Sequence, residues 1–377
     1  MLDPGIRVVS LMLTTRCNLR CAYCYQRKAA PRTMSREVID AALRQLVTSR
    51  LARPGLTLYG GEPLLAALLV RRALDRVRDW APPWMKPDIE VFTNGTRLDA
   101  KMTRLLVRRN VFLTLSFDGI APAQDDRSPG SFEILDRLLV RLRREHPGYF
   151  RTRLGVKATL TPRNIPYLAA SIRYFLARGV RDVDVAPVFL PEPSWSRELA
   201  RELDRQLAEV VRLSIETLRA SGTIPFSHFR GSASERSIEG GAPCGCGSRG
   251  LLFVDVDGEV APCTALATSV LGPVPRAIRH VVKALGGLRL TDADLSAALL
   301  RREQRAGRLS FLAPSVRRYG PYGPCARCEI RAACFVCPVA VAYNGGRVPA
   351  FHCDVNSLLA RHRAVFMRQA RELNRAS

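Results

Sequence analysis

Residues 8–24 read VVSLMLTTRCNLRCAYC and join an apolar segment to three closely spaced cysteines. Residues 8–14 are mostly apolar or β-branched, which predicts a short buried strand. The strand runs directly into Cys17, Cys21 and Cys24, in a C-x3-C-x2-C spacing. Three soft thiolate ligands on one loop favour an iron–sulfur cluster. Zinc is the weaker alternative, because a structural zinc site needs four protein ligands and no fourth Cys or His lies nearby in the sequence.

Outward from this loop, apolar strand patterns alternate with helical ones. Strands are expected over residues 8–14, 56–59, 89–93, 111–117, 153–160 and 183–188. Helices are expected over residues 35–50, 64–80, 99–109, 131–145, 164–178 and 196–220. Sixfold strand–helix alternation predicts an α/β fold, a partial (β/α)6 TIM-type barrel with helices outside a parallel sheet. Ligands are then expected at the carboxyl ends of the strands.

The pattern changes after residue 220. Residues 221–250 are rich in Gly, Ser and Pro, which predicts a loop or linker. The segment LLFVDVDGEVAPC, residues 251–263, predicts a hairpin that turns at Asp257-Gly258. A basic helical stretch and a cysteine cluster follow, and a last helix is expected over residues 355–373. We therefore place a barrel domain at residues 1–230 and a small cysteine-rich domain at residues 231–377.

Composition excludes several classes of protein. Apolar residues make up 47% and charged residues 24%, as in globular proteins. The apolar runs are too short for a membrane span and no secretory signal is visible, so we expect a cytoplasmic protein without a membrane partner. Eleven cysteines, an odd number, then argue for metal or cluster ligation rather than disulfides. The net charge of +24 favours an acidic partner such as a peptide, a nucleic acid or a phosphorylated metabolite.

The loop CNLRCAYCY after a strand resembles the cluster loop of the radical S-adenosylmethionine (SAM) enzymes. The resemblance implies a [4Fe–4S] cluster held by Cys17, Cys21 and Cys24, with SAM bound at its open iron. It also implies reductive cleavage of SAM to a 5′-deoxyadenosyl radical that abstracts hydrogen from a substrate. Tyr23 is placed near the adenine by this resemblance, although a core aromatic role is the open alternative.

Three further strand ends resemble elements of the same family. They are GGEP (Gly60, Gly61, Glu62, Pro63), TNG (Thr93, Asn94, Gly95) and S-x-D-G (Ser116, Asp118, Gly119). The resemblance assigns Gly60, Gly61, Glu62, Pro63, Thr93, Asn94, Ser116 and Asp118 to cofactor binding, with the Glu62 carboxylate approaching the ammonium of SAM. The polar groups of S-x-D-G suit SAM or the substrate. Asp125, Arg127 and the Gly-Ser-Phe of residues 130–132 follow a D…R…GSF pattern found in a large peptide-modifying branch. Gln124 stands where that branch often has His.

The cysteines of the second half resemble the SPASM extension of radical SAM enzymes, which holds two auxiliary [4Fe–4S] clusters. By this resemblance, auxiliary cluster I uses Cys244, Cys246, Cys263 and Cys337. Auxiliary cluster II uses Cys325, Cys328, Cys334 and Cys353. The last spacing of the C-x2-C-x5-C-x2-C run departs from the family, which usually has three intervening residues. The three clusters together need all eleven cysteines; if Cys246 is not a ligand, it is a free thiol.

The leading hypothesis is an oxidoreductase or peptide maturase. It oxidises or crosslinks a side chain of an acidic precursor peptide or protein, with an external electron donor such as flavodoxin or ferredoxin. Only 16 residues precede Cys17, so leader recognition is expected from a separate protein. Thr264 stands where sulfatase-maturing enzymes typically have Asp, which argues against that activity. The alternative is a radical dehydrogenase or epimerase acting on an aminoglycoside or nucleoside intermediate. A zinc and nucleic-acid-binding protein is disfavoured by the GGEP and S-x-D-G elements.

Overall fold

The computed structural model describes residues 5–26, 31–190, 192–230, 246–270, 274, 276, 279–308, 328–330, 337–344 and 347–376. Cys244, Cys325 and Cys334 lie outside these residues. The chain divides into two compact units. The first comprises residues 1–18, 24–113 and 238–320, and the second comprises residues 19–23, 114–237 and 321–377.

A sheet forms the centre of the first unit. Its strand order is β3 (Asp88–Thr93), β2 (Gly55–Tyr59), β1 (Val8–Met12), β7 (Leu251–Val254), β8 (Glu259–Ala261) and β9 (Leu288–Arg289). The first four of these strands are parallel, whereas β8 and β9 pair antiparallel. Val9 in the central β1 lies opposite Leu56 on one side and Leu252 on the other, and all three are buried. This continuous apolar layer explains why the sequence of β1 is nearly uniformly hydrophobic.

The expected hairpin of residues 251–263 forms, with β7 and β8 as its two strands. Gly258 takes a φ of +84°, a left-handed value that favours glycine, and its N–H donates to the Asp255 carbonyl over 3.0 Å. The pairing of β7 with β1 is a finding that the hairpin pattern did not predict. A segment that follows the expected linker thus extends the sheet that carries the first cysteine loop.

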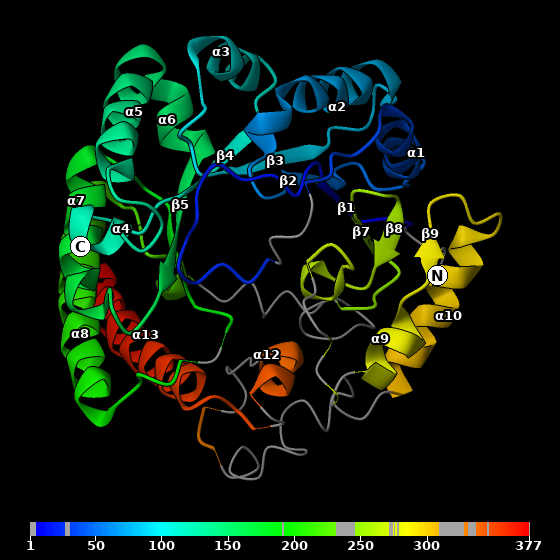
Figure 1. The fold of residues 1–377 in the computed structure, drawn as a ribbon. Coiled ribbons are helices and arrows are strands. Elements are labelled where there is room, and N and C mark those ends of the chain that lie inside the picture. The colour runs from blue at the N-terminus through cyan, green and yellow to red at the C-terminus, as the bar shows by residue number, and fades with distance from the viewer. Residues whose placement is uncertain are drawn as a thin grey trace. The chain divides into compact units, whose positions relative to one another are not determined.

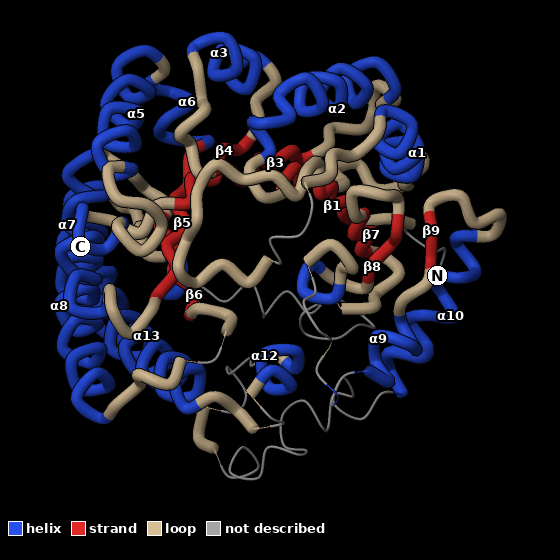
Figure 2. The backbone as a smooth tube through the Cα atoms, viewed as in Figure 1, coloured by secondary structure: helices blue, strands red, loops and turns tan. Residues whose placement is uncertain are grey.

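Helices cover the sheet of the first unit, as Figures 1 and 2 show for α1 (Arg36–Val47), α2 (Ala67–Trp80) and α3 (Ala100–Arg108). Capping side chains fix two of their starts. Ser35 accepts from the N–H of Val38 over 3.3 Å, and Asp99 accepts from the N–H of Met102 over 2.7 Å. The later helices of this unit are α9 (Arg279–Leu285) and α10 (Leu295–Arg308).

The second unit contains β5, β6 and the last three residues of β4, with helices packed around them (Figure 1). Its strands are β4 (Phe112–Ser116), β5 (Leu154–Leu160) and β6 (Val183–Pro187), and its longer helices are α5 (Ser131–Glu145), α7 (Leu168–Arg178), α8 (Arg197–Ser221) and α13 (Ala350–Ala376). The strands β5 and β6 are parallel. The helix α13 lies beside α8 (Figure 1), and its Phe366 stacks on Phe229 with ring centroids 4.8 Å apart. The last helix begins at Ala350, five residues before the predicted start.

The six predicted barrel strands are all present within about two residues of their expected bounds. The helix predicted from residue 64 instead opens with a 3-10 turn, η1 (Pro63–Ala66), before α2 begins at Ala67. The cause is local: the Glu62 side chain accepts from the N–H of Leu64 over 2.9 Å, so a side-chain cap replaces the first helical bond. Two short helices, α4 (Ala121–Gln124) and α6 (Pro147–Arg153), were not predicted.

Candidate functional site

Gly60 and Gly61 hold the end of β2 against the chain that leads to the first cysteines. A Cβ on Gly60 would lie 2.5 Å from the Thr14 carbonyl oxygen, and one on Gly61 would lie 2.4 Å from that of Arg16. The N–H of Gly61 donates to the Thr14 carbonyl and the N–H of Glu62 to the Arg16 carbonyl, each over 2.8 Å. Glycine is therefore required at both positions for this close backbone approach, immediately before Cys17.

Glu62 is completely buried, and both of its carboxylate oxygens accept hydrogen bonds from protein groups. Oε1 accepts from the N–H of Leu64 over 2.9 Å and from the Thr93 hydroxyl over 2.7 Å. Oε2 accepts from the N–H of Asn94 over 2.7 Å. All three donors are neutral, and no described Lys or Arg forms an ion pair with Glu62. Burial raises the pKa of Glu62, although the three hydrogen bonds oppose that shift.

Asn94 continues this network to the cysteine loop. Its amide nitrogen donates to the Asn18 side-chain oxygen over 3.1 Å and lies 4.0 Å from the sulfur of Cys17. The Asn94 side-chain oxygen accepts from the Thr96 hydroxyl over 2.7 Å, and Thr96 in turn accepts from Asn18 over 2.8 Å. The GGEP and TNG elements, expected from sequence only as separate strand ends, thus form one hydrogen-bonded group with the residues around Cys17.

In the second unit, Asp118 after β4 is the centre of another buried group. Its Oδ1 accepts from Arg127 Nη2 over 2.9 Å and from the N–H of Thr159 over 2.7 Å. Its Oδ2 accepts from the hydroxyl of Tyr23, and the Arg127 guanidinium lies 5.4 Å from the centre of the Tyr23 ring. Burial raises the pKa of Tyr23 well above its usual range. Burial works against the charge of Arg127, but Asp118, Tyr23 and Cys21 act together in the opposite direction, and the pKa of Arg127 is raised.

Gln124 is hydrogen-bonded to the backbone of Asp118. Its side-chain oxygen accepts from the N–H of Asp118 over 2.8 Å, and its amide nitrogen donates to the Ser131 hydroxyl over 2.9 Å. Gln124 is fully buried, so this bridge explains the residue that departs from the expected His. Arg127, Gln124 and Thr159 were absent from the predicted binding residues. The D…R…GSF pattern was the signal that could have identified Arg127.

The other predicted residues are placed as follows. Pro63 starts η1, and Ser116, half-buried, is the last residue of β4. Cys17 and Cys353 are exposed, Cys21, Cys24, Cys263, Cys328 and Cys337 are half-buried, and Cys246 is buried. None of these eight described cysteines forms a disulfide, as the predicted ligand role requires. Cys353 lies in the first turn of α13.

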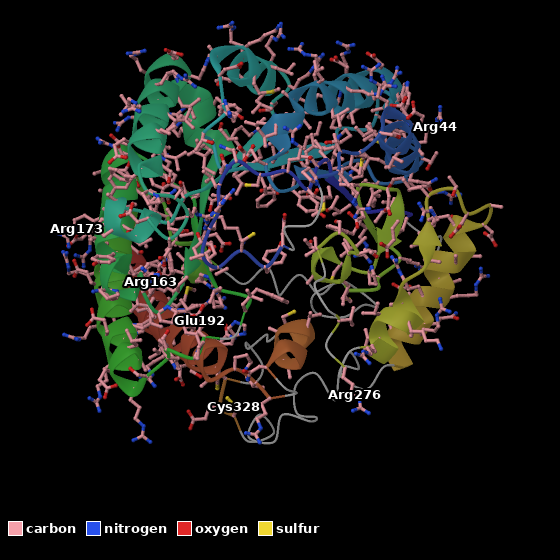
Figure 3. All side chains as sticks on the ribbon, viewed as in Figure 1. Arg44, Arg163, Arg173, Glu192, Arg276 and Cys328 are labelled. Atoms are coloured by element: carbon pink, nitrogen blue, oxygen red, sulfur yellow. The ribbon has the colours of Figure 1, made fainter. Side chains whose placement is uncertain are left out.

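The positive charge extends over the outer helices, where Figure 3 shows Arg44 of α1 and Arg173 of α7 on outward-facing sides. Many of these arginines pair with acidic neighbours, such as Arg173 with Glu209 and Arg72 with Asp40. Among the described residues, no helix combines the length and the apolar character that crossing a membrane demands.

Comparison with known proteins adds three findings. Residues 11–152 match the family profile of the radical SAM superfamily. GTP 3′,8-cyclase of Parasynechococcus marenigrum is 35% identical over 131 residues, which cover 33% of this chain and 37% of that enzyme. The matched stretches span only 27–64% of the lengths of the curated relatives.

Solved structures resemble the chain over a greater length. Native anSMEcpe with bound AdoMet and Cp18Cys peptide aligns with a TM-score of 0.73 at 16% identity, covering 98% of this chain and all of that one. SuiB of Streptococcus suis bound to the precursor peptide SuiA aligns with a TM-score of 0.57 at 13% identity, covering 90% and 73%. These similarities confirm the predicted fold, a partial barrel followed by a C-terminal region like that of SPASM-containing enzymes.

The radical SAM family implies a [4Fe–4S] cluster and SAM as cofactors. The donor set of this chain fits that pair, because Cys17, Cys21 and Cys24 offer three thiol ligands on one loop and none of them forms a disulfide. The matched family profile and the shared fold lead to one conclusion: residues 11–152 of this chain form a radical SAM domain.

Proposed function

We propose that this protein is a radical SAM enzyme that oxidises or crosslinks a side chain of a peptide or protein. Cys17, Cys21 and Cys24 would hold the SAM-binding [4Fe–4S] cluster. When bound, the cluster and SAM supply a 5′-deoxyadenosyl radical that abstracts hydrogen from the substrate. The observation that carries the proposal is the hydrogen-bonded path from buried Glu62 through Asn94 to the surroundings of Cys17.

The residues proposed to bind SAM are Tyr23, Gly60, Gly61, Glu62, Pro63, Thr93, Asn94, Ser116 and Asp118. Within this set, Glu62 acts from inside the protein. Its oxygens are already bonded to backbone and hydroxyl donors, so it orients the TNG turn and adds negative potential without facing solvent. Asp118 holds the Tyr23 hydroxyl and Arg127 in fixed positions and leaves the Tyr23 ring to form a packing surface.

The two auxiliary clusters extend this proposal. Cys244, Cys246, Cys263 and Cys337 are assigned to cluster I, and Cys325, Cys328, Cys334 and Cys353 to cluster II. Support comes from the fold shared with SPASM-containing enzymes and from the absence of disulfides among the eight described cysteines. Burial of Cys246, at 5% exposure, favours a ligand over a thiol that meets substrate. An external electron donor, such as flavodoxin or ferredoxin, would reduce the SAM cluster.

A peptide substrate is supported by two structural neighbours, which were solved with the Cp18Cys and SuiA peptides bound. The net charge of +24 suits an acidic precursor, presented with or without a separate leader-binding protein. A small-molecule substrate is the second candidate, because GTP 3′,8-cyclases are among the sequence relatives.

Anaerobic reconstitution of the full chain tests the cofactors. Three [4Fe–4S] clusters correspond to about 12 iron and about 12 sulfide per chain. SAM and dithionite should then give methionine and 5′-deoxyadenosine. Two or more equivalents of zinc with little iron would refute the proposal.

The substrate class is tested by turnover in deuterated water with candidate acidic peptides and, separately, with nucleotides. A peptide product that has lost hydrogen atoms relative to the substrate and carries no deuterium supports oxidation or crosslinking. Deuterium at a substrate carbon indicates quenching by an exchangeable thiol and favours the epimerase alternative. A modified nucleotide with no modified peptide would favour the small-molecule candidate.

A further inference from the structure

The turn that carries Cys246 is fastened to the helix α10 in the first unit. A Cβ on Gly247, whose φ is +77°, would lie 2.8 Å from the Ala306 Cβ, so the turn packs directly on the helix. Two residues later, the N–H of Arg249 donates to Glu303 over 3.2 Å and its guanidinium pairs with the same carboxylate at 3.3 Å. The Cys246 turn therefore has a defined position against α10.

The same turn is joined to the segment that carries Cys263. The N–H of Gly247 donates to the carbonyl of Pro262 over 3.2 Å. The neighbours of two proposed ligands of auxiliary cluster I are thus hydrogen-bonded to each other. This contact places Cys246 and Cys263 on adjacent backbone segments, both next to the end of β8.

Arg302 of α10 is buried beside these segments with no exposed surface. It lies one helical turn before Ala306, on the same face of the helix. Its Nη1 donates to the Val260 carbonyl over 2.8 Å. Its Nε and Nη2 have no hydrogen-bond acceptor within the described part of the chain, and no carboxylate there pairs with it. A buried donor without an acceptor is costly, so two of them on one buried cation point to an anionic partner at this place.

Electrostatics agree with this geometry. Burial lowers the pKa of Arg302 to about 10, and Cys246 and Cys263 act in the opposite direction. The guanidinium is therefore still charged at neutral pH. A cluster ligated by four thiolates is anionic and its sulfurs accept hydrogen bonds, which matches the charge and the two free N–H directions of Arg302.

We propose that Arg302 is a positioning residue that faces auxiliary cluster I, donates to its sulfurs and raises its reduction potential. The inference rests on the proposed auxiliary cluster. Its physical basis is that reduction adds negative charge to the cluster, and a fixed buried cation stabilises the reduced form more than the oxidised form. Replacing Arg302 by a neutral side chain should therefore lower the potential.

The experiment is an EPR-monitored redox titration of the full chain with Cys17, Cys21 and Cys24 replaced by Ala, so that only auxiliary clusters contribute. The component that disappears on Cys246→Ala identifies cluster I. Arg302→Met should shift the reduction equilibrium of that component at least ten-fold toward the oxidised form, a decrease of about 59 mV for a one-electron couple. Arg301→Met is the matched control, since it removes an exposed cation from the same helix and should leave the potential unchanged.

Arg302→Lys keeps the positive charge but replaces the planar guanidinium, so it separates the effect of charge from that of side-chain shape. If Arg302→Met fails to retain cluster I iron, the Lys variant should retain it with a potential near that of the parent. Loss of the cluster from both variants, or an unchanged potential in Arg302→Met, would overturn the inference while the proposed function stands. A parent chain with no auxiliary signal, or none that depends on Cys246, would refute the cluster assignment itself.

Discussion

Glu62 in the first unit and Asp118 in the second are both buried carboxylates that follow a barrel strand, but their charges are balanced differently. Asp118 has its counter-ion in place, because Arg127 donates to it over 2.9 Å. Glu62 has three neutral donors and no described cationic partner. A buried anion without a counter-ion is costly, and its pKa is raised by burial. Asp118 therefore has its charge balanced within the described protein, whereas Glu62 has only neutral hydrogen-bond donors around it.

The largest effect should come from removing the thiolates that both carboxylates are proposed to accompany. Replacing Cys17, Cys21 and Cys24 together by Ala should abolish SAM cleavage and leave about eight of about 12 irons. Product analysis with dithionite and iron determination provide the measurements. If 5′-deoxyadenosine still forms, the two carboxylates do not belong to the radical-generating site, and the comparison between them loses its functional meaning.

Replacing Asp118, the carboxylate that has a counter-ion, should mainly lower the free energy of unfolding. Asp118→Asn leaves Arg127 buried without its counter-ion, and breaking a buried pair in this way costs about 3–5 kcal/mol in the free energy of unfolding. Urea denaturation measures the loss. Adding Arg127→Met should recover part of it, because the unpaired charge is then gone.

The matched control for Asp118 is Asp136, which accepts from Tyr174 and Arg178, both over 2.6 Å, but near the surface. Asp136→Asn removes the same Asp–Arg–Tyr contacts in solvent and should cost no more than about 1 kcal/mol. Equal losses at Asp118 and Asp136 would show that burial does not set the strength of the Asp118 group.

Glu62→Gln should reduce SAM affinity roughly ten-fold, because the charge interaction with SAM is lost. A ten-fold change in affinity corresponds to about 1.4 kcal/mol. The amide also brings an NH2 group against one of three N–H or O–H donors, which disturbs the TNG turn. Thr93→Val is the comparison variant, since it removes one hydrogen bond to Glu62 and keeps the charge; it should cost about 1 kcal/mol of stability and lower SAM affinity less than Glu62→Gln does. Equilibrium SAM binding to the reconstituted proteins distinguishes the two variants. Equal affinities in the parent, Glu62→Gln and Thr93→Val would show that GGEP is only a structural turn.

The smallest expected effect is a pH dependence. The folded-state pKa of Glu62 lies above its ordinary value of 4.5, so the folded chain binds more protons than the unfolded chain between the two values. Stability from this group is therefore lost as pH rises through the folded pKa. The unfolding free energy of the parent minus that of Glu62→Gln should fall over this range. Urea titrations at several pH values measure the difference, and a constant difference would show that the Glu62 pKa is unshifted.

Much of the fold and of the candidate site could be predicted because the sequence patterns that indicate them are local. Short apolar runs and helical apolar patterns located the barrel strands and most helices, and sequence motifs located the GGEP, TNG and S-x-D-G strand ends. The side chains that complete each group come from distant segments. Thr159 and Gln124 reach Asp118 from β5 and α4, and no short-range pattern marks such contacts.

Residue types and short spacings are enough to predict that a cysteine loop follows the first strand and that polar motifs end the next strands. Which charges are paired becomes visible only in the folded chain. Glu62 and Asp118 look alike in sequence, yet one is enclosed by neutral donors and the other by Arg127. Arg302 is one arginine among many along the chain, and what distinguishes it is complete burial without a described carboxylate partner. The physical reason is that the cost of a charge depends on its surroundings, which long-range packing creates.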